Sequence, residues 1–310
     1  MKILSSTTEF EFMGRRRLAV AVSLVVIAVS IVSLAVRGLN FGIDFTGGLL
    51  LEVGYEQPAD LDAIRSQLAT AGYEAAQVQN FGSANDVLIR ILPRDEADTT
   101  KLGDQIVKLL QSGGREVELR RVEFVGPQVG EELTERGGTA MIFALLMILG
   151  YIMFRFQWKF AVGSVAALIH DVIIVIGFFS VFQLPFDLSV LAAVLAVIGY
   201  SLNDTIVVFD RIRENFRQIR RGTAESIMNT SINQTLSRTI ITGLTTLLVL
   251  VALYAVGGES VSGFSLALII GIIVGTYSSI YTASAMALAL DVRTEDLLEP
   301  KKTEEADSLP

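Results

Sequence analysis

Six long apolar runs, separated by shorter polar segments, dominate the pattern of the chain. A helix needs about 20 mostly apolar residues to cross a bilayer, and most of these runs are close to that length. The pattern therefore predicts six membrane-spanning helices, of which the second is the shortest. The predicted spans are residues 18–36, 139–154, 161–182, 188–209, 239–256 and 264–290.

Residues 37–138 form the one long extramembrane segment, which lies between the first two runs. Within it, Val87, Ile89 and Ile91 alternate as in a half-buried strand, whereas "ADLDAIRSQLATAGY" places apolar residues at helical spacing. The whole segment predicts the order β-α-β-β-α-β, the ferredoxin-like arrangement. The expected fold is thus a six-helix α-helical transmembrane bundle with an α+β ferredoxin-like domain between its first two helices. That domain occurs with many functions, so it does not indicate one here.

The distribution of Lys and Arg predicts the orientation. Basic residues precede the first span, join the second span to the third, and fill residues 210–238, whereas the loops at 183–187 and 257–263 contain none. Because positive loops face the cytoplasm, residues 1–17 and the charged tail 291–310 are predicted to be cytoplasmic and the α+β domain external. The apolar core of the first run is longer than the roughly 7–15 residues of a signal peptide, so we expect an uncleaved anchor.

The basic loop 210–238 has an amphipathic pattern. Ile212, Phe216 and Ile219 share one helical face, and arginines crowd the rest. We expect a cytoplasmic helix that lies on anionic headgroups. Two roles are open for it: a positively charged topology anchor, or a surface on which a partner docks.

Composition excludes several kinds of protein. The net charge of −8 argues against a nucleic-acid binder, and the absence of cysteine excludes disulfides, thiolate metal sites and cysteine nucleophiles. The single histidine excludes a multi-histidine zinc site. No Walker-type loop, HExxH or nucleophile elbow occurs. We therefore expect no enzymatic activity, no metal and no cofactor.

Charged and polar residues nevertheless interrupt the fourth and fifth spans. Asp204, with Asn203 beside it, lies near the end of the fourth span, and Arg238 opens the fifth at a compatible depth. A carboxylate in hydrocarbon costs about 2.5–3.5 kcal/mol even on lenient scales, so it calls for a functional explanation. Thr242 and then Thr245 or Thr246 continue a polar stripe from Arg238, and we expect this stripe to face Asp204 across a hydrated seam. The alternatives are a carboxylate that reaches the interface and an ordinary helix-end arginine.

His170 and Asp171 fall near the middle of the third span, where charge is costliest. They are either a hydrogen-bonded pair that fixes helix packing or part of a proton relay. In the sixth span, Gly271 and Gly275 have the small-xxx-small spacing of a tightly packed helix.

The segment "FGIDFTGG" follows directly on the first span. Its glycines tolerate backbone conformations that other residues resist, so it is either a hinge for the external domain or a plain tight turn. The candidate residues are Phe41, Gly42, Asp44, Gly47 and Gly48.

Several of these motifs resemble the SecD/SecF family of bacterial protein-export membrane proteins, in particular its SecF branch. The resemblance rests on "FGIDFTGG", "HDV" (170–172), "VIGYSLNDTIVVFDRIREN" (197–215), "QTLSRTIITGLTT" (234–246) and the last span, and it covers about residues 14–292.

The resemblance implies half of a twelve-span unit of the resistance-nodulation-division type in the bacterial inner membrane. It implies pairing with SecD, association with SecYEG and YajC, a periplasmic external domain, and use of the proton-motive force to promote export of unfolded polypeptides. The family's proton path falls here on Asp204 and Arg238, with Asn203, His170 and Asp171 as further candidates. Half of a small-molecule exporter of the same superfamily, or a non-transporting scaffold of the channel, are the alternatives.

Overall fold

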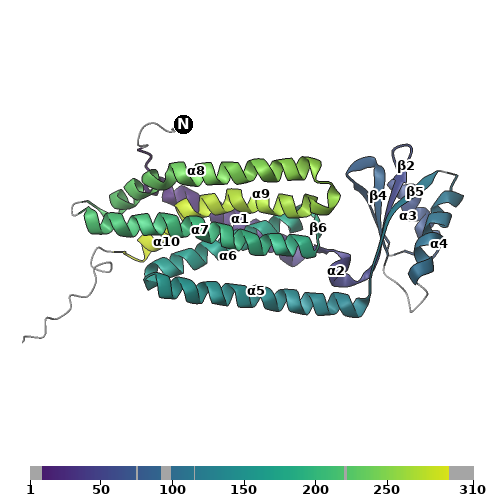
Figure 1. Cartoon of the computed structure of the whole chain (residues 1–310), viewed down its shortest axis with the longest axis horizontal. Helices are drawn as coiled ribbons and strands as arrows, with labels where there is room; N and C mark the ends of the chain where they lie inside the picture. Colours follow the sequence, from purple (N-terminus) through teal and green to yellow (C-terminus); the bar gives the residue numbers. More distant parts are fainter. Residues whose placement is uncertain (1–8, 75, 92–98, 115, 220–221, 293–310) are drawn as a thin grey trace, which may run out of the picture.

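The computed structural model describes residues 9–74, 76–91, 99–114, 116–219 and 222–292. An elongated helical bundle carries an α+β domain at one end, as Figure 1 shows. We call this end of the bundle the domain end, and the opposite end, where Arg155, Arg213 and Arg217 lie, the arginine end.

Six helices of the described chain are long and apolar enough to span a membrane, in agreement with the sequence pattern. The last of them is interrupted by one turn of π-helix, η2 (Ser279–Ala283), between α9 and α10. The bundle consists of α1 (Arg16–Arg37), α5 (Pro127–Arg155), α6 (Trp158–Phe182), α7 (Leu188–Gln218), α8 (Ala224–Val256), α9 (Glu259–Ser278) and α10 (Ser284–Ala289).

The α+β domain has the predicted order of elements. A four-stranded antiparallel sheet with the order β3-β4-β2-β5 carries two helices on one face. Buried Leu51, Val53 and Ile89 pack with Leu68 and Ile106 of those helices. The elements are β2 (Gly48–Tyr55), α3 (Leu61–Thr70), β3 (Gln77–Phe81), β4 (Ser83–Ile91), α4 (Thr99–Ser112) and β5 (Val117–Val125).

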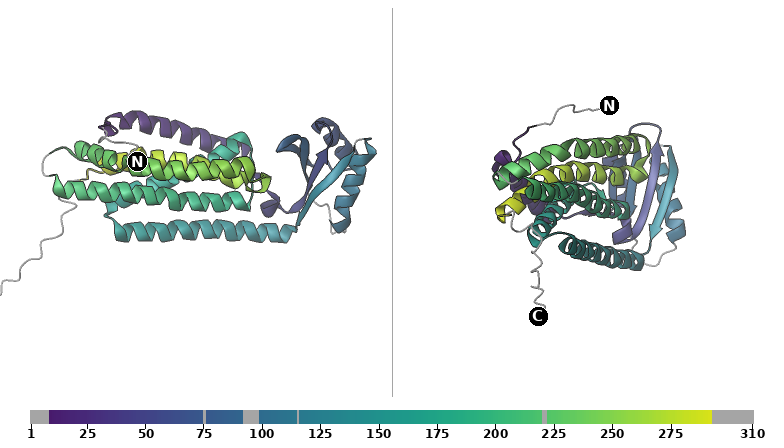
Figure 2. Two further views of the ribbon diagram at one scale, coloured as in Figure 1. Left: turned by 45° about the horizontal axis from the view of Figure 1, so that its top comes forward. Right: turned by 60° about the vertical axis from the view of Figure 1, so that its left-hand side comes forward.

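The second spanning helix differs from its prediction. It begins at Pro127 rather than at residue 139, with Pro in its first turn, where the missing N–H costs nothing. The added turns contain Glu131, Glu132 and Arg136, so a search for apolar residues could not detect them. Figure 2 shows α5 set apart along one side of the bundle, and most of its side chains are exposed.

The prediction of a separate amphipathic helix at 210–238 is wrong. The basic segment instead extends α7 to Gln218 and begins α8 at Ala224. Ile212 and Phe216 are buried in the chain's own core, where they contact the first turns of α8, and are therefore not available to headgroups. The apolar face of Ile212 and Phe216 was predicted correctly, but the rest of the bundle covers it and not the membrane surface.

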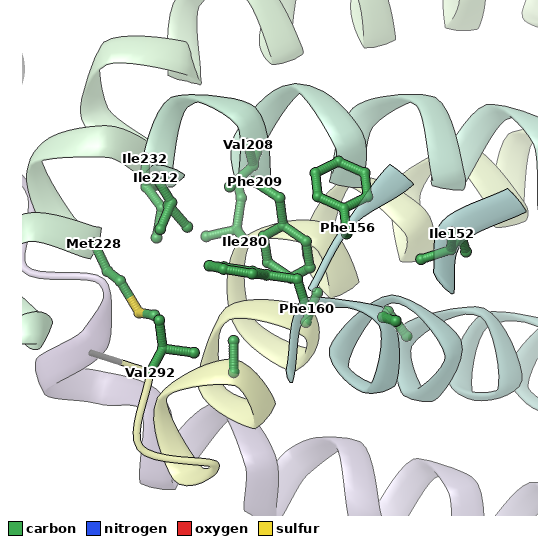
Figure 3. Close-up of a cluster of buried hydrophobic side chains, with 14 of the residues drawn as sticks. Ile152, Phe156, Phe160, Val208, Phe209, Ile212, Met228, Ile232, Ile280 and Val292 are labelled. Atoms are coloured by element: carbon green, nitrogen blue, oxygen red, sulfur yellow. The ribbon is translucent and has the colours of Figure 1, made fainter. Parts of the chain in front are cut away.

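Aromatic packing fills the core near the arginine end (Figure 3). The rings of Phe160 and Phe209 lie 4.8 Å apart, and Phe156 contacts Phe209 edge-on. Ile280, Met228 and other apolar side chains from three more helices complete this cluster. The core thus fixes α7 relative to α6, α8 and the last span.

Candidate functional site: buried polar groups between the spanning helices

Asp204 lies inside the bundle, with 9 % of its surface exposed. Its Oδ1 accepts a hydrogen bond of 2.6 Å from the hydroxyl of Thr239 on α8. Its Oδ2 is buried and makes no hydrogen bond of ordinary geometry among the described residues, although the hydroxyl of Ser279 lies near the carboxylate. Leaving a buried oxygen unpaired costs about 1–3 kcal/mol or more, so this arrangement lowers the stability of the folded chain. A carboxyl group of this kind is able to gain and lose a proton.

Small residues make this burial possible. A side chain at Gly271 of α9 would place its Cβ 2.1 Å from a methyl carbon of Val197, and one at Gly275 would lie 2.9 Å from Ser201. The two glycines therefore let α9 approach α7 closely, as their spacing predicted. The polar groups of α7 near this contact are sealed from lipid.

Arg238 does not contact Asp204 directly. Its side chain is exposed, and no ion pair joins it to Asp204 within the part of the chain that the structure describes. It is nevertheless close enough to act electrostatically on the carboxylate. The neighbouring Thr239, which the sequence reading passed over, makes the hydrogen bond instead.

The expectation that the stripe on α8 faces Asp204 is wrong. Thr242 and Thr245 are exposed, and their hydroxyls donate to carbonyls of their own helix. Asn203 is also exposed. Because α7 and α8 are antiparallel and Asp204 faces Thr239, the preceding residues Asn203 and Arg238 both project to one side of the helix pair.

Ala196 and Gly199 of α7 are exposed on the same side as Asn203, at helical spacing. We call this surface the α7/α8 face; its members are Ala196, Gly199, Asn203, Arg238, Thr242 and Thr245. It combines small and polar residues within the apolar stretches of the two helices.

His170 and Asp171 form the centre of a second buried group on α6. The Nδ1 of His170 lies 2.8 Å from Asp171 Oδ1, and its Nε2 lies 3.1 Å from the hydroxyl of Ser23 on α1. The other carboxylate oxygen, Oδ2, accepts from Ser201 at 2.5 Å and from Ser278 at 2.8 Å. The pair thus links α1, α6, α7 and α9 by hydrogen bonds in the dry interior.

The two buried groups are connected through Ser201 and the π-helical turn. Ser201 donates to Asp171, and its carbonyl accepts a long bond of 3.5 Å from Ser279. Ser279 in turn lies 2.9 Å from the hydroxyl of Thr205, next to Asp204 in sequence. π-Helical turns occur frequently at functional sites, and here the turn presents Ser279 between the two carboxylates.

The "FGIDFTGG" segment lies at the domain end and holds the α+β domain to the bundle. β1 (Asn40–Phe41) pairs with β6 (Pro185–Phe186), which lies in the turn between α6 and α7. The carboxylate of Asp44, within α2 (Ile43–Thr46), accepts a hydrogen bond of 2.9 Å from the backbone N–H of Leu188. A Cβ at Gly42 would lie 3.0 Å from the Cβ of Asp187, so this close contact favours glycine. Gly47 and Gly48 have positive φ, as a tight turn requires.

Arg90 completes this attachment from the side of the domain. Its guanidinium, on β4, donates to the carbonyl of Phe41 at 2.6 Å. Burial lowers the pKa of Arg90 from its ordinary value, and the carboxylates of Asp187 and Asp44 act in the opposite direction. Sequence reading missed Arg90, since a single arginine in a strand has no local signal.

No group of three or more His, Asp or Glu side chains that would hold a metal ion occurs in the described part of the chain. The buried groups are carboxylates, hydroxyls and one imidazole. Groups of these kinds can accept and donate protons.

Comparison with known proteins places these features in a family. Residues 105–293 match the family described as "Protein export membrane protein SecD/SecF, C-terminal", and residues 32–59 match the "SecD/SecF GG Motif". The protein translocase subunit SecF of Vibrio alginolyticus is 52 % identical over 100 % of this chain and 99 % of its own. The chain belongs to the SecD/SecF family.

Other members of the SecD/SecF family agree with this assignment, which confirms the resemblance seen in the sequence. SecF of Escherichia coli O157:H7 is 47 % identical over 97 % of this chain and 94 % of its own. The crystal structure of SecDF, a translocon-associated membrane protein from Thermus thermophilus, superposes with a TM-score of 0.84 at 38 % identity. The match covers 94 % of this chain but 39 % of the solved SecDF chain.

Proposed function

We propose that the chain is the SecF subunit of an accessory complex of the Sec protein translocase, and that it couples proton flow to protein export. The observation that carries this proposal is the buried Asp204 carboxyl group with one oxygen unpartnered. Moving one elementary charge across a membrane releases about 2.3 kcal/mol per 100 mV, which a proton-binding carboxyl group can use. The chain acts as a transport component and not as an enzyme.

In this proposal Asp204 carries the proton, Thr239 positions the carboxylate, and Arg238 modulates its charge. An opposite charge nearby favours the ionised form of a carboxyl group. Arg238 is exposed beside Asn203, so a shift of this flexible side chain changes the field at Asp204 without rearranging the core. The His170–Asp171 pair and Asn203 are secondary members of the proposed path.

The α7/α8 face supports SecD as the partner that completes the path. Small residues allow helices to approach closely, and polar side chains between helices are stabilised by hydrogen bonds across the contact. The chain spans 39 % of the solved SecDF chains, which leaves the remainder of those chains to supply such a partner. We also propose association with SecYEG and YajC, a location in the bacterial inner membrane, and both termini in the cytoplasm.

Half of a small-molecule exporter is less well supported, because the single external domain is small. Its α+β core consists of one four-stranded sheet and two helices, and apolar side chains fill the space between them. A passive scaffold would not need the unpaired oxygen of Asp204. Substitution of Asp204 distinguishes a coupling subunit from a passive scaffold.

The test is Asp204→Asn in cells and in proteoliposomes that contain the whole translocase. We expect the variant to insert and to co-purify with SecD, and to lose the stimulation of export by the proton-motive force. Asp62→Asn, which removes a carboxylate from the surface of the α+β domain, should retain that stimulation. If Asp204→Asn keeps full proton-dependent stimulation, the chain is a scaffold and the coupling proposal is wrong.

A further inference from the structure

A cleft at the arginine end of the bundle combines three arginines from two helices that are far apart in sequence. Arg155 ends α5, and Arg213 and Arg217 lie near the end of α7 (Figure 1). The cleft has a volume of about 420 Å³. Its lining residues are Arg155, Asp210, Arg213, Glu214, Arg217 and Gln218.

Two arginines of the cleft share a single carboxylate. Arg155 donates to both oxygens of Asp210 at 3.0 Å, and Arg213 approaches the same carboxylate at 3.6 Å. One carboxylate thus serves two arginines. Glu214 bonds at 2.5 Å to Arg211, which lies outside the cleft.

Arg213 provides a second observation. Its Nε atom is buried and has no hydrogen-bond partner in the described structure. Arg155 and Arg217 both lie close enough to repel its charge. The guanidinium of Arg213 also lies 5.5 Å from the centroid of the Phe156 ring. An anionic oxygen in the cleft would relieve the repulsion among these guanidinium groups, and phosphate accepts hydrogen bonds from arginine well.

An exposed apolar surface begins where the cleft ends. Phe154, directly before Arg155, is 95 % exposed, and Met147 and Tyr151 precede it on the outward side of α5. Trp158 follows at 60 % exposure. Tryptophan and tyrosine favour the level of the headgroups, and the two helices that carry this surface, α5 and α6, are each apolar enough to span a membrane. A ligand that fits both parts has an anionic head and a hydrocarbon tail.

We propose that this cleft is a binding site for an anionic phospholipid. The phosphate is held by Arg213, Arg217 and Arg155, and the acyl chains lie along the exposed face of α5. A lipid is favoured over an acidic protein partner because the apolar part of the site lies on a spanning helix, where hydrocarbon is the surrounding solvent. This site is separate from Asp204 and does not depend on the proposed coupling.

The experiment uses the full-length chain, delipidated in detergent and titrated with phosphatidylglycerol or phosphatidylcholine while bound lipid is counted by native mass spectrometry. Each arginine near a headgroup contributes on the order of 1 kcal/mol, so Arg213→Gln with Arg217→Gln should weaken phosphatidylglycerol binding by about 30-fold. Binding of phosphatidylcholine should not change. Arg136→Gln, an exposed arginine at the other end of α5, is the matched control and should bind as the parent does.

Asp210→Asn distinguishes a charged site from a merely intact fold. Removing the carboxylate raises the positive charge of the cleft, so phosphatidylglycerol should bind more tightly, whereas a damaged fold would bind less. Equal affinity of the parent for the two lipids overturns the proposal. So does a double arginine variant that still binds phosphatidylglycerol as the parent does. Chemical modification of the arginines gives a further test. If an acidic protein that co-purifies with the chain protects them from modification, and lipid does not, the site belongs to a protein partner and the proposal is wrong.

Discussion

Single residues decide how deeply polar groups are buried in this bundle. Gly271 and Gly275 bring α9 against α7, and the serines beside them supply hydroxyls without occupying much volume. Asp171 therefore finds Ser201 and Ser278, while Asp204 receives one hydrogen bond, from Thr239. The same close packing that satisfies the Asp171 carboxylate leaves one oxygen of Asp204 unpaired, so the two buried carboxylates have different surroundings.

We predict that Gly271→Ala lowers the free energy of unfolding by about 1–3 kcal/mol, the usual cost of overpacking a core. The added methyl group would clash with Val197, a stiff β-branched side chain that cannot move aside easily. Thermal unfolding in detergent measures the loss. Gly150→Ala is the control because its new Cβ has open space, and Val197→Ala added to Gly271→Ala should recover part of the stability. Equal stability of the two alanine variants would contradict the packing account.

At the scale of elements, the "FGIDFTGG" segment joins four parts of the molecule. It follows α1, leads into β2, and pairs through β1 with the turn before α7. It also contacts α5, because a side chain at Gly130 of α5 would clash with the backbone of Phe45 and Gly47. α7 begins beside this segment, where Asp187 caps its first turn, and continues without a break to Asp204. A displacement of the α+β domain would therefore act directly on the helix that carries the proposed proton site. Whether the segment also serves as a hinge stays a prediction.

We predict that Arg90→Gln loosens the attachment of the α+β domain. Hydrogen bonds of a charged group are worth about 1.5–3 kcal/mol, so the backbone amides at Gly42 and Leu188 should exchange hydrogen about ten-fold faster or more. Hydrogen exchange followed by mass spectrometry measures this. Arg65→Gln is the matched control, because Arg65 donates to the carbonyl of Val78 within the domain only. Unchanged exchange at Gly42 and Leu188 in Arg90→Gln would show that this arginine does not hold the attachment.

At the scale of the whole molecule, the outward surface is not uniformly apolar. α1 and α5 expose valine, leucine, phenylalanine and methionine, which suits lipid. The α7/α8 face instead exposes Asn203, Arg238 and threonines, which a bilayer would not stabilise. The α7/α8 face therefore differs from the lipid-suited surfaces of α1 and α5, and in our proposal it is the side that the partner covers.

We predict that Gly199→Leu reduces co-purification with SecD by about ten-fold or more, because a large side chain prevents the close helix approach that small residues permit. The variant should remain as stable as the parent when alone, since a Cβ at Gly199 meets nothing within the chain. Gly150→Leu on exposed α5 is the control. Undiminished co-purification of Gly199→Leu would place the partner on another face.

Sequence alone determined the six spans, the order of elements in the α+β domain and the family. The reason is that apolar length and alternation report burial, which is a local property of each segment, and that the family motifs are contiguous. His170, Asp171 and Asp204 were found in the same way, because a charge within an apolar run is visible without any contact.

Only the tertiary structure decided which groups meet. The rotation of each helix about its axis set Thr239, and not Arg238, against Asp204, and it turned Thr242 and Asn203 outward. The burial of Ile212 and Phe216 in the bundle, the attachment made by Arg90, and the arginine cleft depend on residues that are distant in the chain. Helical periodicity shows that a helix has two faces, but the packing of the other helices determines what each face touches.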